Sequence, residues 1–279
     1  MKFKIVADSS CDIDKSMEAR MNVQIVPLTL EVEGVRYIDD ETFDIDDYLA
    51  KAHASSQNPK SSCPSPDDYL RAYKGEEEGI FGITLSSELS GSFASANLAK
   101  NLYQDQDPSK KIHIFDSKSA ASGEALIAIK IQECIEEGMS FEEIVETVEA
   151  FVAEMATVFI LEKIDHLQKA GRMSKTKLTI ANVLNIKLIL KANEHGEVEL
   201  HDQARGTKKA IEKLVKSLPQ VGKVTSQKIL VIAECQAEEK AKTIQKMIQD
   251  MYDFRDVVIV KMRGLSSNYA NSGGIVISF

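Results

Sequence analysis

The sequence predicts a two-domain α/β protein: a Rossmann-like parallel sheet in an N-terminal domain, residues 1–155, and a C-terminal α+β domain, residues 156–279. The chain has 279 residues with 43% hydrophobic content, more than one small core requires. Its first half alternates short apolar runs with helical segments, which is typical of a parallel sheet covered by helices. After Met155 this order changes, so we place the domain boundary near residue 156.

The N-terminal domain is expected to hold three parallel strands, each followed by a loop and a helical segment. These strands are residues 3–7, 80–85 and 112–115. Between the first two, residues 23–30 and 31–37 are expected to form strands around a glycine turn, which predicts a small inserted hairpin subdomain at about residues 22–60. The clearest helix begins after Gly138, because Ser140 and Glu143 have capping-box spacing and apolar residues then recur at helical period.

The C-terminal domain is expected to mix strands and helices. The expected strands are residues 158–161, 187–192, 198–204, 229–235, 257–260 and 275–279. The expected helices are residues 164–169, a helix from about Lys175, residues 207–218 and residues 238–252. The second and third strands flank His195 and Gly196, so they should form a hairpin.

The net charge, the cysteine content and the motifs of the sequence exclude several classes of function. A formal net charge of −9 with scattered lysines argues against a nucleic-acid partner. The four cysteines form no CxxC pair, so neither a zinc site nor a disulfide framework is expected, and reduced thiols suit a cytoplasmic protein. No apolar run suggests a signal peptide or a membrane anchor. Motifs for nucleotide phosphates, dinucleotides, serine hydrolase elbows and zinc proteases are missing from the sequence, so we expect no cofactor and no catalytic residues.

Two serine-rich loops each precede a predicted helix start. One contains Ser61 and Ser62, and the other contains Ser90, Gly91 and Ser92. Either loop alone could simply cap a helix. Together, at the same end of one sheet, they would form one anion site, because hydroxyl groups and free N–H groups at a helix N-terminus bind a carboxylate or phosphate.

Arg172 lies in a glycine-containing turn from which its guanidinium could reach a cleft between the domains and hold a carboxylate. The alternative is a structural arginine that pairs with an acid across the domain interface. Arg205 and Arg263 are weaker candidates of the same kind. Asp8, Asp12 and Asp116 follow predicted strands, where aspartates usually order loops, so we expect structural roles for them and no metal site.

The two serine loops and three further segments, in this order, resemble the DegV family of bacterial fatty-acid-binding proteins. The further segments are Asp8-Ser9-Ser10-Cys11-Asp12, Phe115-Asp116-Ser117-Lys118 with Ser122-Gly123, and residues 167–174. The resemblance implies a non-enzymatic carrier that buries one long-chain fatty acid between its domains. It also implies a partner, a separate ATP-dependent fatty acid kinase that makes an acyl phosphate for phospholipid synthesis.

The resemblance also assigns residues. Ser61 matches a usual threonine and Ser62 matches directly, while Ser90-Gly91-Ser92 matches Ser-Gly-Thr, which makes Ser61 and Ser90 the expected head-group ligands. The arginine matching Arg172 is associated both with the head group and with the partner protein. This chain departs from the family at Ala270, where a histidine usually joins the head-group network; Tyr269 or Asn271 could supply a replacement donor.

Two alternatives of other classes remain: a module that senses a small anion, and a serine hydrolase whose histidine arrives through folding. The three hypotheses differ in whether the ligand has an acyl chain and in whether the protein hydrolyses a substrate. A bound acyl chain without hydrolysis favours the carrier, a short polar anion favours the sensor, and release of product from an ester favours the hydrolase.

Overall fold

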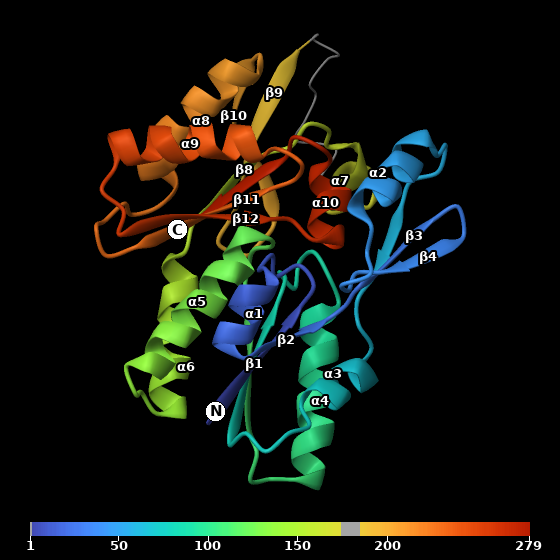
Figure 1. Ribbon diagram of the computed structural model, residues 1–279, viewed down its shortest axis with the longest axis vertical. Coiled ribbons are helices and arrows are strands. Elements are labelled where there is room, and N and C mark those ends of the chain that lie inside the picture. The colour runs from blue at the N-terminus through green and yellow to red at the C-terminus, as the bar shows by residue number, and fades with distance from the viewer. Residues whose placement is uncertain (1, 174–184) are drawn as a thin grey trace.

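The computed structural model describes residues 2–173 and 185–279, and its first sheet is the predicted parallel one. Its strands, in spatial order, are β2 (Val23–Val26), β1 (Phe3–Asp8), β6 (Gly79–Thr84) and β7 (Lys111–Asp116). All neighbours in this sheet run parallel. Strands β1 and β6 are buried at every position, as expected of parallel strands covered on both faces. Figure 1 shows this sheet in the lower part of the molecule.

Helices cover both faces of the parallel sheet. On one face lie α3 (Pro66–Ala72) and α4 (Ser92–Gln106), and on the other lie α1 (Lys15–Met21), α5 (Ser122–Glu136) and α6 (Phe141–Glu154). Successive residues of β1 point to opposite faces, so Val6 packs with the α3 and α4 side and Ile5 with the α5 side. The predicted capping box of α6 is confirmed, because Ser140 and Glu143 cap each other's backbone.

The second sheet has six strands and lies in the upper part of Figure 1. In spatial order they are β10 (Val198–Arg205), β9 (Ile186–Ala192), β8 (Thr157–Ile160), β13 (Ile275–Ser278), β11 (Ile229–Glu234) and β12 (Asp256–Lys261). The predicted hairpin of β9 and β10 is confirmed as an antiparallel pair. Only β11 and β12 pair in parallel, so the sheet is mixed as the α+β pattern predicts.

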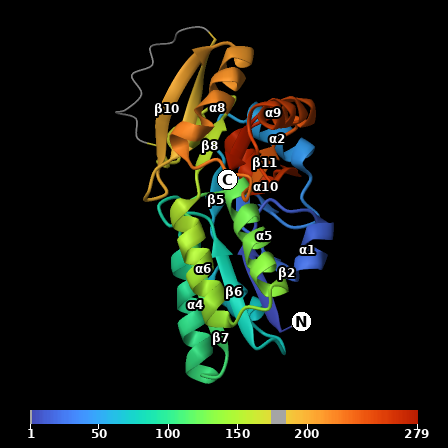
Figure 2. The same ribbon diagram turned by 90° about the vertical axis from the view of Figure 1, so that its left-hand side faces the viewer.

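The two faces of the second sheet have different neighbours. Helices α8 (Thr207–Val221) and α9 (Glu238–Met251) pack on its outer face with Val158. Its inner face, which includes Phe159, joins the core of the N-terminal part. Helix α5 contacts strands of both sheets and is therefore the packing element between them (Figure 2).

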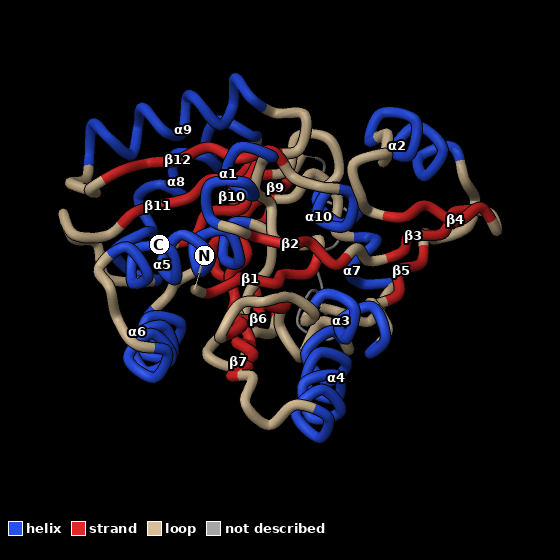
Figure 3. Tube along the Cα trace, turned by 60° about the horizontal axis from the view of Figure 1, so that its bottom comes forward, coloured by secondary structure: helices blue, strands red, loops and turns tan. Residues whose placement is uncertain are grey.

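A small antiparallel sheet projects beside the second sheet, and its bounds differ from the predicted hairpin. It contains β4 (Val35–Ile38), β3 (Thr29–Val32) and β5 (Lys60–Ser62). The expected strand over residues 23–30 is two strands, of which β2 belongs to the parallel sheet, because Pro27 and Leu28 separate it from β3. Helix α2 (Ile45–Ala54) connects β4 to β5 and lies against α10 (Gly264–Ala270), as Figure 3 shows.

The predicted short helix over residues 164–169 is α7 (Asp165–Lys169). The helix predicted from about Lys175 lies outside the described residues. The domain boundary near residue 156 stays a prediction, although the second sheet begins at Thr157. Within the described ranges, no helix is long and apolar enough to cross a membrane.

Candidate functional site

A cavity of about 300 Å³ lies between the loops at the carboxyl ends of the parallel strands and the inner face of the second sheet. This size falls at the lower end of the range of small-molecule sites, about 300–1,000 Å³. Its wall is largely apolar and includes Leu28, Leu89, Phe159, Met262 and Val276. Because ligands of open α/β sheets bind outside the carboxyl ends of the strands, this cavity is the candidate site.

Most of the serine-loop residues predicted from the sequence line this cavity. Ser61, Ser62, Ser90 and Gly91 are in its wall, whereas Ser92 is fully buried behind Ser90, with 3.1 Å between their hydroxyl oxygens. The two serine loops also touch each other. Ser95 Oγ donates to the carbonyl of Pro64 at 2.7 Å, and a Cβ placed on Gly91 would lie 3.2 Å from Cys63 Sγ.

The helices after the two loops differ in how their N-termini are capped. Ser65 and Asp68 form a capping box at α3, so the N-terminus of α3 is satisfied by its own side chains. No side chain caps α4 from its N-cap residue Gly91, although Ser90 Oγ accepts from the N–H of Ser92 at 3.2 Å. The N-terminus of α4 is therefore the better place for an anion.

Arg172 also lines the cavity and is the one charged side chain in its wall among the described residues. Its Nε donates to the carbonyl of Leu89 at 3.1 Å, and its Nη1 donates to the carbonyl of Ala170 at 2.7 Å. Arg172 thus reaches from the turn after α7 to the loop that carries Ser90. The other candidate arginines, Arg205 and Arg263, are not in the wall.

Helix α10 supplies several cavity residues, one of them at position 270, where the resemblance predicts a histidine in related chains. Tyr269 and Ala270 are both in the wall, and the hydroxyl groups of Tyr269 and Ser61 are 2.9 Å apart. A phenol therefore occupies the position next to Ser61. Asn271 is not in the wall; its Oδ1 lies 3.0 Å from Nε2 of His53.

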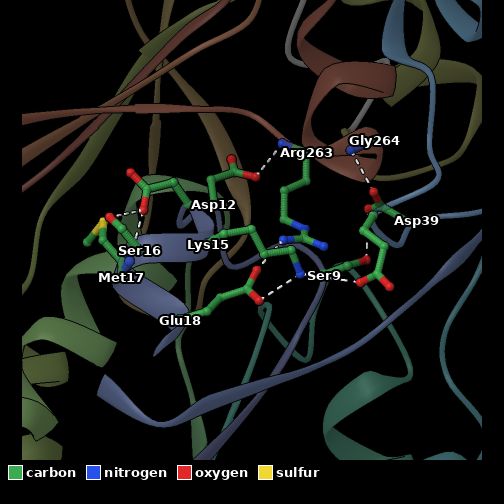
Figure 4. Close-up of polar contacts among 11 residues, drawn as sticks. Ser9, Asp12, Lys15, Ser16, Met17, Glu18, Asp39, Arg263 and Gly264 are labelled. Atoms are coloured by element: carbon green, nitrogen blue, oxygen red, sulfur yellow. Dashed lines mark hydrogen bonds and ion pairs between the residues drawn. The ribbon is translucent and has the colours of Figure 1, made fainter. Parts of the chain in front are cut away.

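Carboxylates of the N-terminal part hold the start of α10 in place (Figure 4). Asp39, which is 1% exposed, accepts hydrogen bonds from the N–H groups of Gly264 and Leu265 at 2.7 and 2.8 Å, and from Ser9 Oγ at 2.8 Å. Asp12 accepts from the N–H of Arg263 at 2.7 Å, as its expected loop-ordering role requires. The Arg263 side chain pairs with Glu18 at 2.9 Å, and neither residue is in the cavity wall.

Two other carboxyl groups lie under the Ser90 loop and were not predicted as a pair. Asp8 and Glu124 are fully buried. Burial raises the pKa of Asp8 to about 6 and raises the pKa of Glu124 well above its ordinary range. Asp8 still has the predicted loop-ordering role, because it accepts from the N–H groups of Ser10 and Leu85, each at 3.0 Å.

Sequence reasoning missed four further polar residues of the wall. They are Ser10, Ser119, Thr157 and Ser266. Ser10 had a usable signal, because it follows the first strand in the same way that Ser86 and Ser87 follow β6. The hydroxyl oxygens of Ser119 and Thr157 are 2.7 Å apart and share a hydrogen bond, so these two residues close the wall between the two sheets.

The histidines of the described ranges make their hydrogen bonds and ion pairs with groups other than serine hydroxyls. Nδ1 of His166 donates to the carbonyl of Asn268 at 2.7 Å, and Nε2 of His113 lies 2.8 Å from Glu149. A serine nucleophile requires a base within hydrogen-bonding reach. The geometry of the described part therefore does not favour the serine hydrolase hypothesis.

The family comparison covers nearly the whole chain. The model of the family described as "Uncharacterised protein, DegV family" matches residues 2–279. A DegV domain-containing protein of Streptococcus pneumoniae is 38% identical over 281 residues, which cover 100% of this chain and 99% of the relative.

Solved structures of similar proteins carry fatty acids. A DegV family protein of Ruminococcus gnavus with vaccenic acid has a TM-score of 0.96 and 39% identity, and the match covers 100% of both chains. The Fatty Acid Kinase (Fak) B3 protein of Streptococcus pneumoniae, loaded with linoleic acid, has a TM-score of 0.91 and 37% identity over 100% of this chain and 99% of that chain. A DegV family protein of Eubacterium eligens, loaded with heptadecanoic acid, has a TM-score of 0.92 and 33% identity over 99% and 98% of the two chains.

Proposed function

This chain belongs to the DegV family, and we propose that it binds one long-chain fatty acid in the cavity between its two large sheets and presents the acid to a separate ATP-dependent kinase. The observation that carries the proposal is the composition of the cavity wall. It is apolar over most of its surface, and its polar groups include Ser61, Ser90 and the guanidinium of Arg172.

The energetics suit an acyl ligand. Burying about fourteen methylenes at roughly 0.8 kcal/mol each supplies on the order of 11 kcal/mol before the costs of ordering the chain. Because the acyl chain supplies most of the affinity, the polar groups of the cavity mainly have to orient the carboxylate. The hydroxyls of Ser61 and Ser90, the N-terminus of α4 and Arg172 supply donors for one carboxylate.

The apolar wall also favours a fatty acid over the small anion of the sensor hypothesis. A small polar anion would leave Phe159, Met262 and Val276 facing water or an empty space. An acyl chain covers them, and this coverage is the source of the affinity.

The role as a carrier for a kinase rests on similarity. The Streptococcus pneumoniae neighbour, which is 37% identical, is named as a protein of a fatty acid kinase and was loaded with linoleic acid. We propose that this chain likewise supplies the acid and performs no catalysis itself.

Mass spectrometry of lipid extracted from the denatured, purified protein tests the proposal. We expect one equivalent of a long-chain fatty acid from protein made in a bacterial host. An extract with a short polar anion and no acyl chain would favour the sensor, and release of product from an ester by the pure protein would favour the hydrolase. The kinase step is tested separately, by adding a fatty acid kinase and ATP and looking for acyl phosphate.

A further inference from the structure

Four buried hydroxyl groups form a continuous hydrogen-bonded chain between the two large sheets. Ser278 Oγ in β13 lies 2.9 Å from Ser122 Oγ at the start of α5 and 2.9 Å from Thr157 Oγ1 in β8. Thr157 Oγ1 in turn lies 2.7 Å from Ser119 Oγ, in the loop before α5. None of the four residues is more than 6% exposed. The two ends of the chain differ, because Ser119 is in the cavity wall and Ser122 is not.

The ends of this chain determine the direction of its hydrogen bonds. Each hydroxyl group has one proton to donate, so the three links use the protons of three groups and one end keeps a free proton. Ser122 is fully buried, and Ser278 is the one hydrogen-bond partner of its hydroxyl within the described ranges. A free proton at Ser122 would be a buried donor without an acceptor, which is unfavourable. Ser122 therefore donates to Ser278, and each following group donates to the next as far as Ser119.

The proton that remains free belongs to Ser119, at the cavity. The protein acceptor left for it among the described residues is the carbonyl of Ala120, at 3.4 Å. This distance exceeds the range of about 2.5–3.0 Å that is usual for an O–H donor. Because Ser119 lines the cavity, its hydroxyl is a donor available to a ligand.

Ser119 has different neighbours from the expected head-group serines. The hydroxyl of Ser61 hydrogen-bonds to α10 and that of Ser90 to α4, whereas the hydroxyl of Ser119 hydrogen-bonds to β8 of the second sheet. In the part of the chain that the structure describes, no hydrogen bond joins the Ser119 side chain to either of these serines. The cavity wall therefore has a second polar position besides the head-group site.

Another hydroxyl of the wall has no partner. Ser266 lies in α10, and its Oγ is buried without a hydrogen-bond partner among the described residues. The loop after β1 lies between Ser266 and Ser119: Ser10 accepts from the N–H two residues after Ser119, and Asp12 accepts from the N–H three residues before Ser266. An unsubstituted acyl chain along this loop would leave the donors of Ser119 and Ser266 unpaired, which is unfavourable.

We propose that the wall at Ser119 is a second polar subsite of the cavity, which takes an oxygen atom on the acyl chain. The preferred ligand is then a long-chain fatty acid that carries a hydroxyl or oxo group. This inference rests on the proposed function and names its substrate class. Within the described residues, Arg172 is the one charged side chain of the wall, so a neutral oxygen suits the subsite better than a second carboxylate.

Displacement of a fluorescent fatty acid tests the subsite. The competitors are octadecanoic acid, a series of hydroxyoctadecanoic acids with the hydroxyl at different carbons, and the matching oxo acids. We expect one position of the oxygen at which both the hydroxy and the oxo acid bind about two- to tenfold more tightly than octadecanoic acid, the gain of one neutral hydrogen bond. The oxo acids are included because their chain oxygen can only accept, as a donating Ser119 requires.

Ser119→Ala and Ser122→Ala are a matched pair, since they remove the hydroxyl groups at the two ends of the same chain. Ser119→Ala should lose the preference for the oxygenated acid and keep or raise its affinity for octadecanoic acid. Ser122→Ala lies outside the wall and should keep the preference, because Ser278 then begins the chain and Ser119 still has the last proton.

Each other result contradicts the subsite. If octadecanoic acid binds as tightly as every oxygenated acid, the subsite is overturned and the proposed function stands, whereas failure to bind any long-chain acid overturns the proposed function itself. An equal loss of affinity for all acids in Ser119→Ala would place the carboxylate at Ser119. If Ser119→Ala does not fold, the wild type decides: preference for the hydroxy and the oxo acid with oxygen at the same carbon supports a donating Ser119, and preference for the hydroxy acid alone refutes it.

Discussion

Replacing Asp39 with alanine should destabilise the protein far more than any neighbouring surface change. Asp39 accepts three hydrogen bonds, from the N–H groups of Gly264 and Leu265 and from Ser9 Oγ, at 2.7–2.8 Å (Figure 4). Asp39→Ala leaves three buried donors without an acceptor, and each costs about 1–3 kcal/mol. Burial raises the pKa of Asp39, so desolvation already offsets part of the gain from these bonds. We therefore expect a loss near the lower end of the sum, about 3–4 kcal/mol.

Urea unfolding followed by circular dichroism measures this loss. Asp40→Ala is the matched control. Among the described residues, the carboxylate of this adjacent aspartate bonds only to Thr42 in its own turn, so we expect a loss below about 1 kcal/mol. Because α10 carries Tyr269 into the cavity wall, Asp39→Ala should also weaken fatty-acid binding at temperatures where the protein remains folded. If Asp39→Ala and Asp40→Ala unfold at the same urea concentration, Asp39 does not anchor α10.

Three further predictions concern the cavity and the buried carboxyl pair. Ser90→Ala should weaken fatty-acid affinity by about one to two decades, since one hydrogen bond to a charged group contributes about 1.5–3 kcal/mol. Ser87 lies outside the wall, so Ser87→Ala should leave the affinity unchanged. Fluorescent fatty-acid displacement measures both variants, and equal affinities would place the head group elsewhere. Tyr269→Phe should reduce affinity by up to about tenfold with little change in melting temperature, and Tyr37→Phe serves as its control because Tyr37 lies outside the wall. Glu124→Gln should become more stable relative to the wild type as the pH rises above 4.5, by about 1.4 kcal/mol per pH unit. The reason is that the folded wild type keeps a proton on Glu124 that the unfolded chain releases. If the two free energies of unfolding in urea differ by the same amount at pH 5 and pH 7, Glu124 is not protonated in the folded state.

The parts of the fold that follow from local patterns were predicted from the sequence, whereas the small sheet was not delimited correctly. The strands of the parallel sheet are continuous apolar runs, and α6 begins with a capping box, so both have strong local signals. Pro27 was a sequence signal for the break between β2 and β3, but the apolar residues continue through Leu28 and Leu30 and the run was predicted as one strand. Pairing with β1 places β2 in the parallel sheet, and this pairing joins residues that are far apart in the sequence.

The polar part of the candidate site was predictable because serine loops and an arginine turn are recognisable in sequence. The function of Asp39 was not, since Asp39 and Asp40 are identical neighbours with opposite surroundings. Which of them faces the start of α10 depends on a contact 225 residues away along the chain.

The apolar part of the site could not be predicted, and strand geometry gives the reason. Residues of β8 alternate between the two faces of the second sheet, so Val158 packs under α8 and α9 while Phe159 faces the other way. In sequence both are apolar residues of the same short strand. Only the assembled molecule distinguishes them, because the inner face of this sheet is covered by α5 along one part and left open over the cavity along another. The candidate site therefore uses core-type residues, and its position is set by where α5 and the helices after the serine loops begin.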